Sequence, residues 1–391
     1  MLTYTIINNP RELTSAVISW QKVIESNHVV LKDRMLNMET ALAYLTIHAD
    51  KVTPYFIEIT HGNELVAIVP FYTEKRPYPL DFGVFKLATF TLSVMKLFGD
   101  KIIFIDHNRH SEVLECVINC LNSGKIEFDL LLVDKIDSEY QPLWEDTLKN
   151  KKLIRGLNLS ILNQSPEIVR KIDFPATYDE YLASLSRKSR YKYKKTFEKF
   201  CTMFEGKFHF ETFQNQSSVS DFFSYLNDIY KLTWQAKTFG LKERNSDKTI
   251  ALHKVIAEQN QFLSYVLFIE NKPIAFILGY TCAQEYLYFE IGYDENFKNI
   301  EPGKVLAWML IDDLYKNHQI KSLDFDTGEN NYKKVLGNKH YYCNKLLLTK
   351  SYSAASLLIR VQILLRKTYK LIHKIVVKLG LDGKIRKKIK S

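Results

Sequence analysis

The stretch FLSYVLFIENKPIAFILGYTCAQEYLYFEIGYD, residues 262–294, decides the fold because it contains three strand-like segments in a row. Residues 262–270 and 272–281 are short and apolar, and the pair Glu270-Asn271 between them predicts a β-hairpin. Residues 286–294 are rich in aromatic side chains, which favours a third strand. The core of this part of the chain is therefore predicted to be a β-sheet.

The residues that follow predict a helix and two further strands. Glu301-Pro302-Gly303-Lys304 is a turn, and an apolar face at helical spacing comes after it, formed by Val305, Leu306, Met309, Leu310 and Leu314. The segments SLDFD (322–326) and NKLLLT (344–349) are the further strands, and Thr327-Gly328 ends the first of them. This order implies a right-handed crossover, with the loops at the carboxyl ends of the strands available for a site.

The start of that helix has the chemistry of an anion site. We expect the N–H groups of Gly303, Lys304 and Val305 to lack intrahelical partners and to face outward at the positive end of the helix dipole. Such an end suits a phosphate or pyrophosphate, although Pro-Gly also starts helices that bind nothing. The predicted cofactor-binding residues are Pro302, Gly303, Lys304 and Val305, with Lys333 as a further charge partner for a phosphate.

These segments resemble the GNAT acyltransferase superfamily, and in particular its two-domain branch of cellulose- and exopolysaccharide-associated acetyltransferases, which is related to the Fem-type peptidoglycan bridge transferases. The likeness covers about residues 174–349 well and the N-terminal half loosely. It rests on residues 181–190, 272–276, Gly292-Tyr293-Asp294, Pro302-Gly303, and Asp324 through Gly328 to Lys333. In the common pattern a glutamine or arginine and two spaced glycines precede the helix, whereas residues 299–304 have one glycine and the acid Glu301.

The resemblance implies an α/β fold (an α+β mixed sheet) of tandem GNAT-like domains. It implies acyl-CoA, typically acetyl-CoA, as cosubstrate, with no permanently bound cofactor and no metal. It also implies a sugar or cell-envelope precursor as the acceptor.

The chain length of 391 residues accommodates two domains. We predict a degenerate N-terminal GNAT-like domain at residues 1–165, a catalytic GNAT-like domain at 166–352 and a basic helical tail at 353–391. In the first half, residues 55–59 and 65–71 repeat the hairpin through Gly62-Asn63, and a strand (101–106), a helix (111–121) and a strand (128–134) follow it. This copy lacks a Pro-Gly helix start, and two unrelated domains remain the alternative.

The predicted catalytic residues are Asp326, Tyr332 and Glu290. Asp326 ends its strand on the same face as Asp324, and a buried carboxylate pair would raise one pKa into the range of a general base. Capping of the turn at Gly328 is the structural alternative for Asp326. Glu290 is the reserve base, and Tyr332 is the expected proton donor to the leaving thiolate. No Ser-His-Asp or Cys-His spacing is present in the sequence, which favours direct transfer in a ternary complex.

Helices are predicted at residues 178–200, 219–235 and 247–259. The first of them is strongly basic, and its Arg190 and Lys194 lie one turn apart. Both are predicted to bind a phosphate of donor or acceptor, and a merely solvated face or an RNA-binding face are the alternatives. Trp234, Tyr293 and Asp294 are predicted to line the acceptor pocket.

Charge separates the end of the chain from the rest. Residues 330–391 hold 16 Lys or Arg against one acid, while residues 1–329 hold 38 against 43. This layout is not that of a generic nucleic-acid binder, whose basic residues lie on the folded face. Residues 354–379 predict an amphipathic helix that either docks on the body or lies on an anionic membrane. Without a signal-like N-terminus, the predicted location is the cytoplasm, with peripheral contact at the inner face of the membrane if the helix binds lipid.

The sequence therefore predicts an acyltransferase that moves an acyl group from acyl-CoA to an amine or hydroxyl. Its partners would be a small-molecule donor and acceptor, with no nucleic acid unless tRNA is the donor. Two alternatives stay open: a Fem-type aminoacyl-tRNA-dependent transferase and a non-catalytic GNAT-like binding module.

Overall fold

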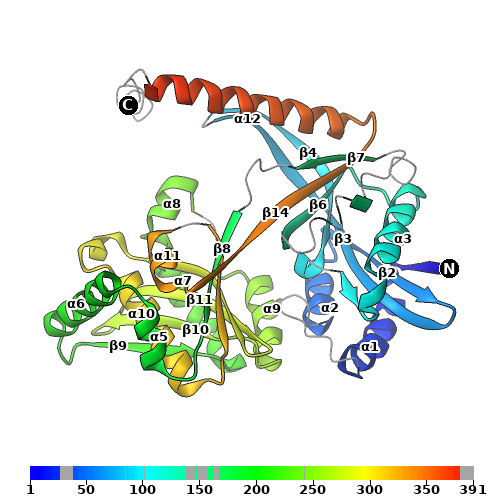
Figure 1. The fold of residues 1–391 in the computed structure, drawn as a ribbon. Coiled ribbons are helices and arrows are strands. Elements are labelled where there is room, and N and C mark those ends of the chain that lie inside the picture. The colour runs from blue at the N-terminus through cyan, green and yellow to red at the C-terminus, as the bar shows by residue number, and fades with distance from the viewer. Residues whose placement is uncertain are drawn as a thin grey trace. The chain divides into compact units, whose positions relative to one another are not determined.

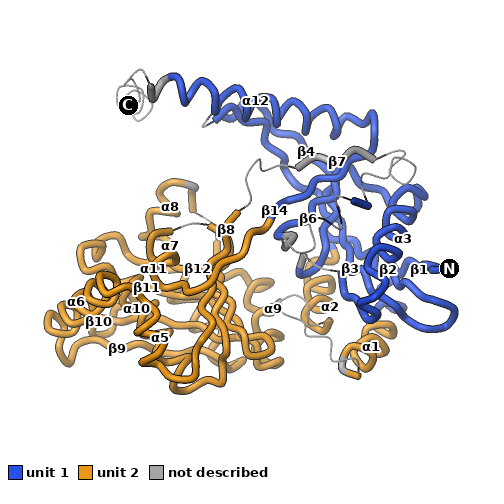
Figure 2. The backbone as a smooth tube through the Cα atoms, viewed as in Figure 1, with its two compact units in different colours: residues 1–13, 50–165, 344–391 blue, residues 14–49, 166–343 orange. Residues whose placement is uncertain are grey.

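The computed structural model describes residues 1–26, 38–83, 85–100, 102–137, 142, 144, 146, 147, 157–161, 167–241, 243–328 and 330–378. The chain divides into two compact units (Figure 2). Residues 1–13, 50–165 and 344–391 form the first, and residues 14–49 and 166–343 the second. Residues 14–49 therefore belong with the second unit although they precede residues 50–165 in the chain, and residues 344–391 belong with the first.

The second unit is a mixed sheet with helices on both faces (Figure 1). Its strands lie in the order β14 (Lys339–Lys350), β8 (Glu167–Asp173), β13 (Ser322–Thr327), β12 (Glu285–Tyr293), β11 (Lys272–Cys282), β10 (Ser264–Ile269) and β9 (Phe208–Phe213). Successive side chains of β11 pack against the helices on opposite faces of the sheet. Ile277 packs in the cluster that contains α10 (Pro302–Asn317), whereas Phe276 and Leu278 pack in the cluster that contains α7 (Val219–Lys231).

The predicted order of elements in this unit is confirmed. Strands β10 and β11 form the hairpin, and Glu270, at φ 54°, makes its turn. Strand β12 pairs antiparallel with β11 and parallel with β13. The connection from β12 to β13 consists of the short helix η4 (Glu295–Ile300) followed by α10. The helix α9 (Asp247–Glu258) is also present as predicted, and α2 (Met38–Ile47) packs against it.

Two predicted helices are each broken in two by a capping residue. The basic helix divides into α5 (Tyr178–Ser184) and α6 (Arg187–Met203), because the side chain of Ser186 accepts a hydrogen bond from the Ser189 N–H at 3.1 Å and starts a new helix. The helix predicted at residues 219–235 likewise divides into α7 and α8 (Trp234–Phe239), where Thr233 caps the Ala236 N–H at 3.2 Å.

The first unit repeats the plan of the second. Strands β2 (Val52–His61) and β3 (Glu64–Phe82) form the predicted hairpin, with Gly62 at φ 63°. Strand β4 (Phe85–Leu97) then pairs with β3, α3 (His110–Asn122) follows, and β6 (Leu130–Asp137) pairs parallel with β4. Further strands of this unit are β1 (Leu2–Ile7), β5 (Ile103–Phe104) and β7 (Leu157–Ile161), and β7 pairs with the second half of β14.

The prediction that residues 101–106 are the counterpart of β12 is wrong, since among the described residues 102–106 only Ile103 and Phe104 are in strand conformation, and they pair with β3. Strand β4 has that place, because it pairs with both the hairpin and β6. Residues 77–84 contain two prolines, an aspartate and a glycine, residues that are typical of turns, so the sequence pattern does not predict the long β3–β4 ladder.

The described part of the chain also contains helices α1 (Pro10–Ser26) and α12 (Ala354–Lys378). Helix α1 follows β1, and α12 follows β14 and contacts β3 of the first unit. None of the helices in the described part of the chain is both long and apolar enough to span a bilayer.

Candidate functional site

The strands β12 and β13 separate at their carboxyl ends. Their parallel ladder covers Glu285–Leu287 opposite Ser322–Asp324, after which β12 continues with β11 and β13 continues with β8. In β12 the register shifts where Leu278 opposes Glu290 and Gly279 opposes Tyr288, so Phe289 is an extra residue, a β-bulge. The bulge bends β12 away from its parallel neighbour and opens the sheet at this point.

A tyrosine stands at the opening. Tyr332, in α11 (Asn331–Leu336), packs against Phe325 of β13 and Tyr288 of β12, with ring centroids 6.1 and 6.3 Å apart. Its hydroxyl lies 3.4 Å from that of Tyr288. Burial raises the pKa of Tyr332 to about 12, so the phenol is protonated at neutral pH and can donate a proton.

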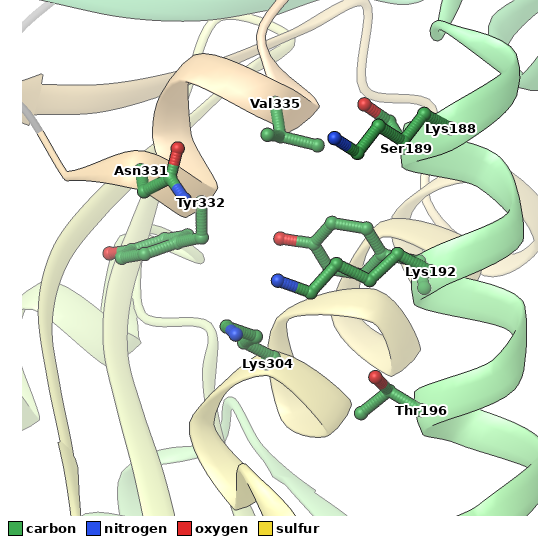
Figure 3. A pocket seen from close by; sticks show the side chains of 9 residues that line it. Lys188, Ser189, Lys192, Thr196, Lys304, Asn331, Tyr332 and Val335 are labelled. Atoms are coloured by element: carbon green, nitrogen blue, oxygen red, sulfur yellow. The ribbon is translucent and has the colours of Figure 1, made fainter.

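A cavity of about 290 Å³ leads to this tyrosine (Figure 3). Lys188 and Lys192 extend into it from α6, and Lys304 reaches it from the first turn of α10. Its lining is completed by Ser189, Tyr193, Thr196, Asn331, Tyr332 and Val335. Since no acid belongs to the lining among the described residues, three ammonium groups set a positive potential there that favours a phosphorylated ligand.

The positive surface continues along α6. A second hollow of about 370 Å³ shares Lys188 and Lys192 and adds Lys195 and Lys199. These four lysines are four, three and four residues apart, so they lie on one face of the helix over roughly 16 Å of its length.

The start of α10 differs from the prediction. Glu301 is the N-cap at φ 51°, and its carbonyl accepts hydrogen bonds from the N–H groups of Lys304 (2.9 Å) and Val305 (3.2 Å). The prediction that both lack intrahelical partners is therefore wrong. The Glu301 carboxylate accepts a hydrogen bond from the Lys304 ammonium and lies 3.5 Å from the Thr196 hydroxyl, so a negative side chain lies beside the cavity.

Two glycines of the resemblance serve packing. A Cβ on Gly303 would lie 3.1 Å from the Ile291 side chain and 3.3 Å from Tyr293, so glycine lets α10 approach β12 closely. A Cβ on Gly292 would meet Phe276 at 2.4 Å. Pro302 occupies the first turn of α10 and is buried, and Tyr293 packs in the same core cluster as α10.

The two aspartates of β13 do not form the predicted pair on one face. Asp326 is at φ 58°, and the register of β13 with β8 shifts between Asp324 and Thr327, which breaks the alternation of side chains. Asp324 is buried, and it accepts hydrogen bonds from the Asp326 N–H (2.7 Å) and the Tyr341 hydroxyl (2.9 Å). Burial raises the pKa of Asp324 to about 6, and the Asp326 carboxylate instead accepts from the Thr327 N–H at 2.5 Å.

Several other predicted site residues have structural partners. The Lys333 ammonium is buried and donates to the carbonyls of Phe325 (2.6 Å) and Thr327 (3.1 Å), which fixes α11 to the end of β13 and directs this charge away from the cavity lining. Asp294 is fully buried, pairs with Lys272 at 3.0 Å and caps η4 through the Asn296 N–H.

Arg190 and Lys194 do not line the lysine cavity. Arg190 donates to the Leu182 carbonyl at 3.3 Å, and Lys194 lies 3.8 Å from Glu198 on the solvent side of α6. Measured from the buried pair Tyr193 and Phe200, one side of α6 carries the lysines at 188, 192, 195 and 199, about 90–150° away, and the other side carries Arg190 and Lys194, about 70–110° away. The spacing alone therefore does not tell which side meets α10.

Glu290 lines a different hollow, of about 240 Å³, on the α7 side of the sheet. Arg244 holds it at 2.7 Å and lies over the Tyr230 ring at 4.5 Å. Buried His253 bonds the Tyr280 hydroxyl at 2.9 Å in the same wall. Trp234 begins α8 and is 45% exposed, outside this lining.

The described residues contain no group of three His, Cys, Asp or Glu side chains that could hold a metal ion. The side chains near the opening offer lysine cations, tyrosine hydroxyls and, on β13, the carboxylates of Asp324 and Asp326.

Comparison with known proteins gives a family match within the second unit and similar folds over most of the chain. Residues 187–334 match the family model described as acetyltransferase (GNAT) domain, and no curated protein sequence matches the chain. Among solved structures, FemX is similar over 92% of this chain and 99% of its own, at a TM-score of 0.58 and 10% identity. L-PGS from Bacillus licheniformis is similar over 92% and 97%, at a TM-score of 0.50 and 12% identity.

A tandem GNAT protein from the clavulanic acid biosynthesis pathway covers 90% of this chain and 100% of its own, at a TM-score of 0.49 and 8% identity. Residues 187–334 are thus similar to the GNAT acetyltransferase domain, and the chain has a mixed α/β fold with a large mixed sheet.

Proposed function

We propose that this protein is an acyltransferase that moves an acyl group from acyl-CoA directly to an amine or hydroxyl of its acceptor. The observation that carries the proposal is the cavity with three lysines that ends at Tyr332, where β12 and β13 separate. A GNAT domain supports the transferase class, and the phosphates of CoA suit the lysines. In this proposal the second unit is catalytic, and the first is its degenerate copy.

The donor would be held at two places. Lys188, Lys192 and Lys304 bind its phosphates beside the positive end of α10. The rest of the donor is proposed to lie along the edge of β12 beyond its ladder with β13. There the main-chain N–H and C=O groups of β12 can form hydrogen bonds with an extended ligand, as they would with a neighbouring strand. This places the thioester near Tyr332, which protonates the departing thiolate.

The acceptor must lose a proton, and two carboxylates are the candidate bases. Asp326 follows Phe325, which packs on Tyr332, and Glu290 adjoins the bulge of β12. Trp234 and Tyr293 are proposed to contact the acceptor, for which the family resemblance favours a sugar or cell-envelope precursor. Cytoplasmic location is part of the proposal, and the five free cysteines support it.

The direct test is calorimetry of CoA and acetyl-CoA with Lys188→Gln, Lys192→Gln and Lys304→Gln. Each variant should weaken binding about 5- to 30-fold, since a charge-assisted hydrogen bond contributes about 1–2 kcal/mol. Lys316→Gln, at the far end of α10, is the matched control and should bind as the parent does. If all three variants bind CoA unchanged, the donor site lies elsewhere.

One observation favours a second candidate, in which the donor is an aminoacyl-tRNA. The lysine face of α6 continues past the first cavity to Lys195 and Lys199, a longer positive surface than one small phosphate group occupies. Filter binding of tRNA should then weaken steeply with salt and fall in Lys195→Gln/Lys199→Gln, while CoA affinity stays unchanged. Salt-insensitive or undetectable tRNA binding excludes this donor.

A further inference from the structure

Helix α12 is attached to the first unit by one of its faces. Ala355 and Ile359 are buried in a cluster with Leu92 and Val94 of β4. Gln362 accepts a hydrogen bond from the Asp81 N–H (2.8 Å) and donates one to the Asp81 carbonyl (3.2 Å). About two turns further on, the Tyr369 ring meets Phe82 edge-on, with ring centroids 5.5 Å apart. The docked face is therefore defined by side chains from 355 to 369.

The opposite face of α12 is apolar and exposed. At 100° per residue, Leu357, Leu364 and Leu371 lie about 160–200° from Ala355. Their exposures are 66%, 63% and 61%, and those of Ile372 and Ile375, on the same side, are 44% and 50%. The stripe formed by Leu357, Leu364, Leu371, Ile372 and Ile375 thus points to solvent, away from the docked side chains. An apolar stripe of this length on the surface marks a binding site.

Basic residues border the stripe on one edge. Arg360, Lys367 and Lys374 are seven residues apart and exposed, at about 100–140° from the docked face. Residues 354–378 contain six Lys or Arg and no acid. The end of the β3–β4 hairpin, which contacts Tyr369, adds Phe85 and Leu87, exposed to 54% and 56%.

We propose that the exposed stripe of α12 is a docking surface for an anionic lipid bilayer. The leucines and isoleucines enter the boundary between headgroups and acyl chains, and Arg360, Lys367 and Lys374 remain at the level of the lipid phosphates. A second copy of this chain fits the stripe less well, because pairing two such helices brings cations together with no carboxylate between them. The basic edge selects an anionic surface, and each basic residue near it contributes to attraction.

Co-sedimentation of the full chain with vesicles tests the proposal. We expect binding to phosphatidylglycerol/phosphatidylcholine vesicles at low salt and at least 10-fold weaker binding to phosphatidylcholine alone. Leu364→Gln/Leu371→Gln should abolish binding, whereas Arg360→Gln/Lys367→Gln/Lys374→Gln should reduce it about 10-fold or more and remove its dependence on salt. Ile18→Gln, an exposed apolar residue of α1 at 61%, is the control that should leave binding unchanged.

All altered side chains are exposed, so the melting temperatures of the variants should match that of the parent, which separates lost binding from lost folding. A parent protein that stays in the supernatant with anionic vesicles at low salt overturns the proposal. So does a dimer in sedimentation velocity that Leu364→Gln/Leu371→Gln dissociates, since the stripe would then bind a second copy. The measurement uses no acyl donor, and its outcome is independent of the proposed reaction.

Discussion

Glu301 is the residue at which this chain departs most from the common GNAT pattern. Its carboxylate lies against the Lys304 ammonium, beside the cavity where the donor's phosphates are proposed to bind. A phosphate that enters must compete with this carboxylate for Lys304. The residue therefore weakens anion binding while its backbone caps α10.

We predict that Glu301→Gln binds CoA about 5- to 10-fold more tightly than the parent, because removing one negative charge near the phosphates is worth about 1 kcal/mol at a wet surface. Calorimetry at low salt measures the difference, which should shrink as salt rises. Glu198→Gln, on the solvent side of α6, is the control. Weaker binding in Glu301→Gln would mean that the carboxylate organises the site instead of competing with the ligand.

Asp324 gives a second prediction at this scale, in the pH dependence of stability. Burial raises its pKa from 3.8 to about 6 in the folded chain, so between these values the folded state binds more protons than the unfolded state. Stability from this group is then fully present below about pH 4 and is lost as pH rises through 6. Asp324→Asn keeps the shape and removes the titration.

The midpoint of urea unfolding should therefore rise in Asp324→Asn relative to the parent at pH 7.5, and the gain should be smaller at pH 4.5. The full difference amounts to at most about 3 kcal/mol, from two pKa units. A difference between variant and parent that is constant from pH 4.5 to 7.5 contradicts the raised pKa.

At the scale of elements, patterns of apolar residues were sufficient to predict β10 to β13 and α10, because each has one strong period and a clear turn after it. The breaks at Ser186 and Thr233 were missed, since a capping side chain interrupts a helix without changing the apolar pattern around it. The prediction of the site residues was affected in the same way. Arg190 and Lys194 belong to α6, the helix that lines the lysine cavity, but which face of α6 meets α10 depends on tertiary packing that the spacing of charges alone does not encode.

The break at Ser186 also yields a prediction. Its hydroxyl caps the Ser189 N–H, and the first turn of α6 carries Lys188. Ser186→Ala should cost about 1 kcal/mol of stability and weaken CoA binding, because the turn that positions Lys188 frays. Ser218 precedes α7 but makes no capping bond, so Ser218→Ala should have the smaller effect in both urea unfolding and calorimetry. Equal effects of the two changes would show that the Ser186 cap does not order the site.

For the whole molecule, the repeated plan explains why one unit is proposed to be catalytic. The parallel ladders Val94–Lys96 with Leu130–Leu132 and Glu285–Leu287 with Ser322–Asp324 occupy equivalent places. In each ladder an aspartate follows two residues after the last paired residue of the second strand: Asp134 after Leu132, and Asp326 after Asp324. Asp134 is held by Lys96 at 3.4 Å and Lys345 at 3.2 Å, all within the first unit. These two ion pairs give Asp134 a structural role.

The matched pair Asp134→Asn and Asp326→Asn therefore distinguishes the units. Asp134→Asn should lower the urea midpoint, with a loss of about 1–3 kcal/mol, because two partly buried lysines lose their shared partner. Its turnover with acetyl-CoA and its affinity for CoA should remain those of the parent.

Asp326→Asn should lower turnover about 100-fold or more if Asp326 is the base, with CoA affinity little changed. Full activity in Asp326→Asn would mean that Glu290 is the base, and turnover of Glu290→Gln tests this. Loss of turnover in a folded Asp134→Asn would mean that the first unit also takes part in the chemistry.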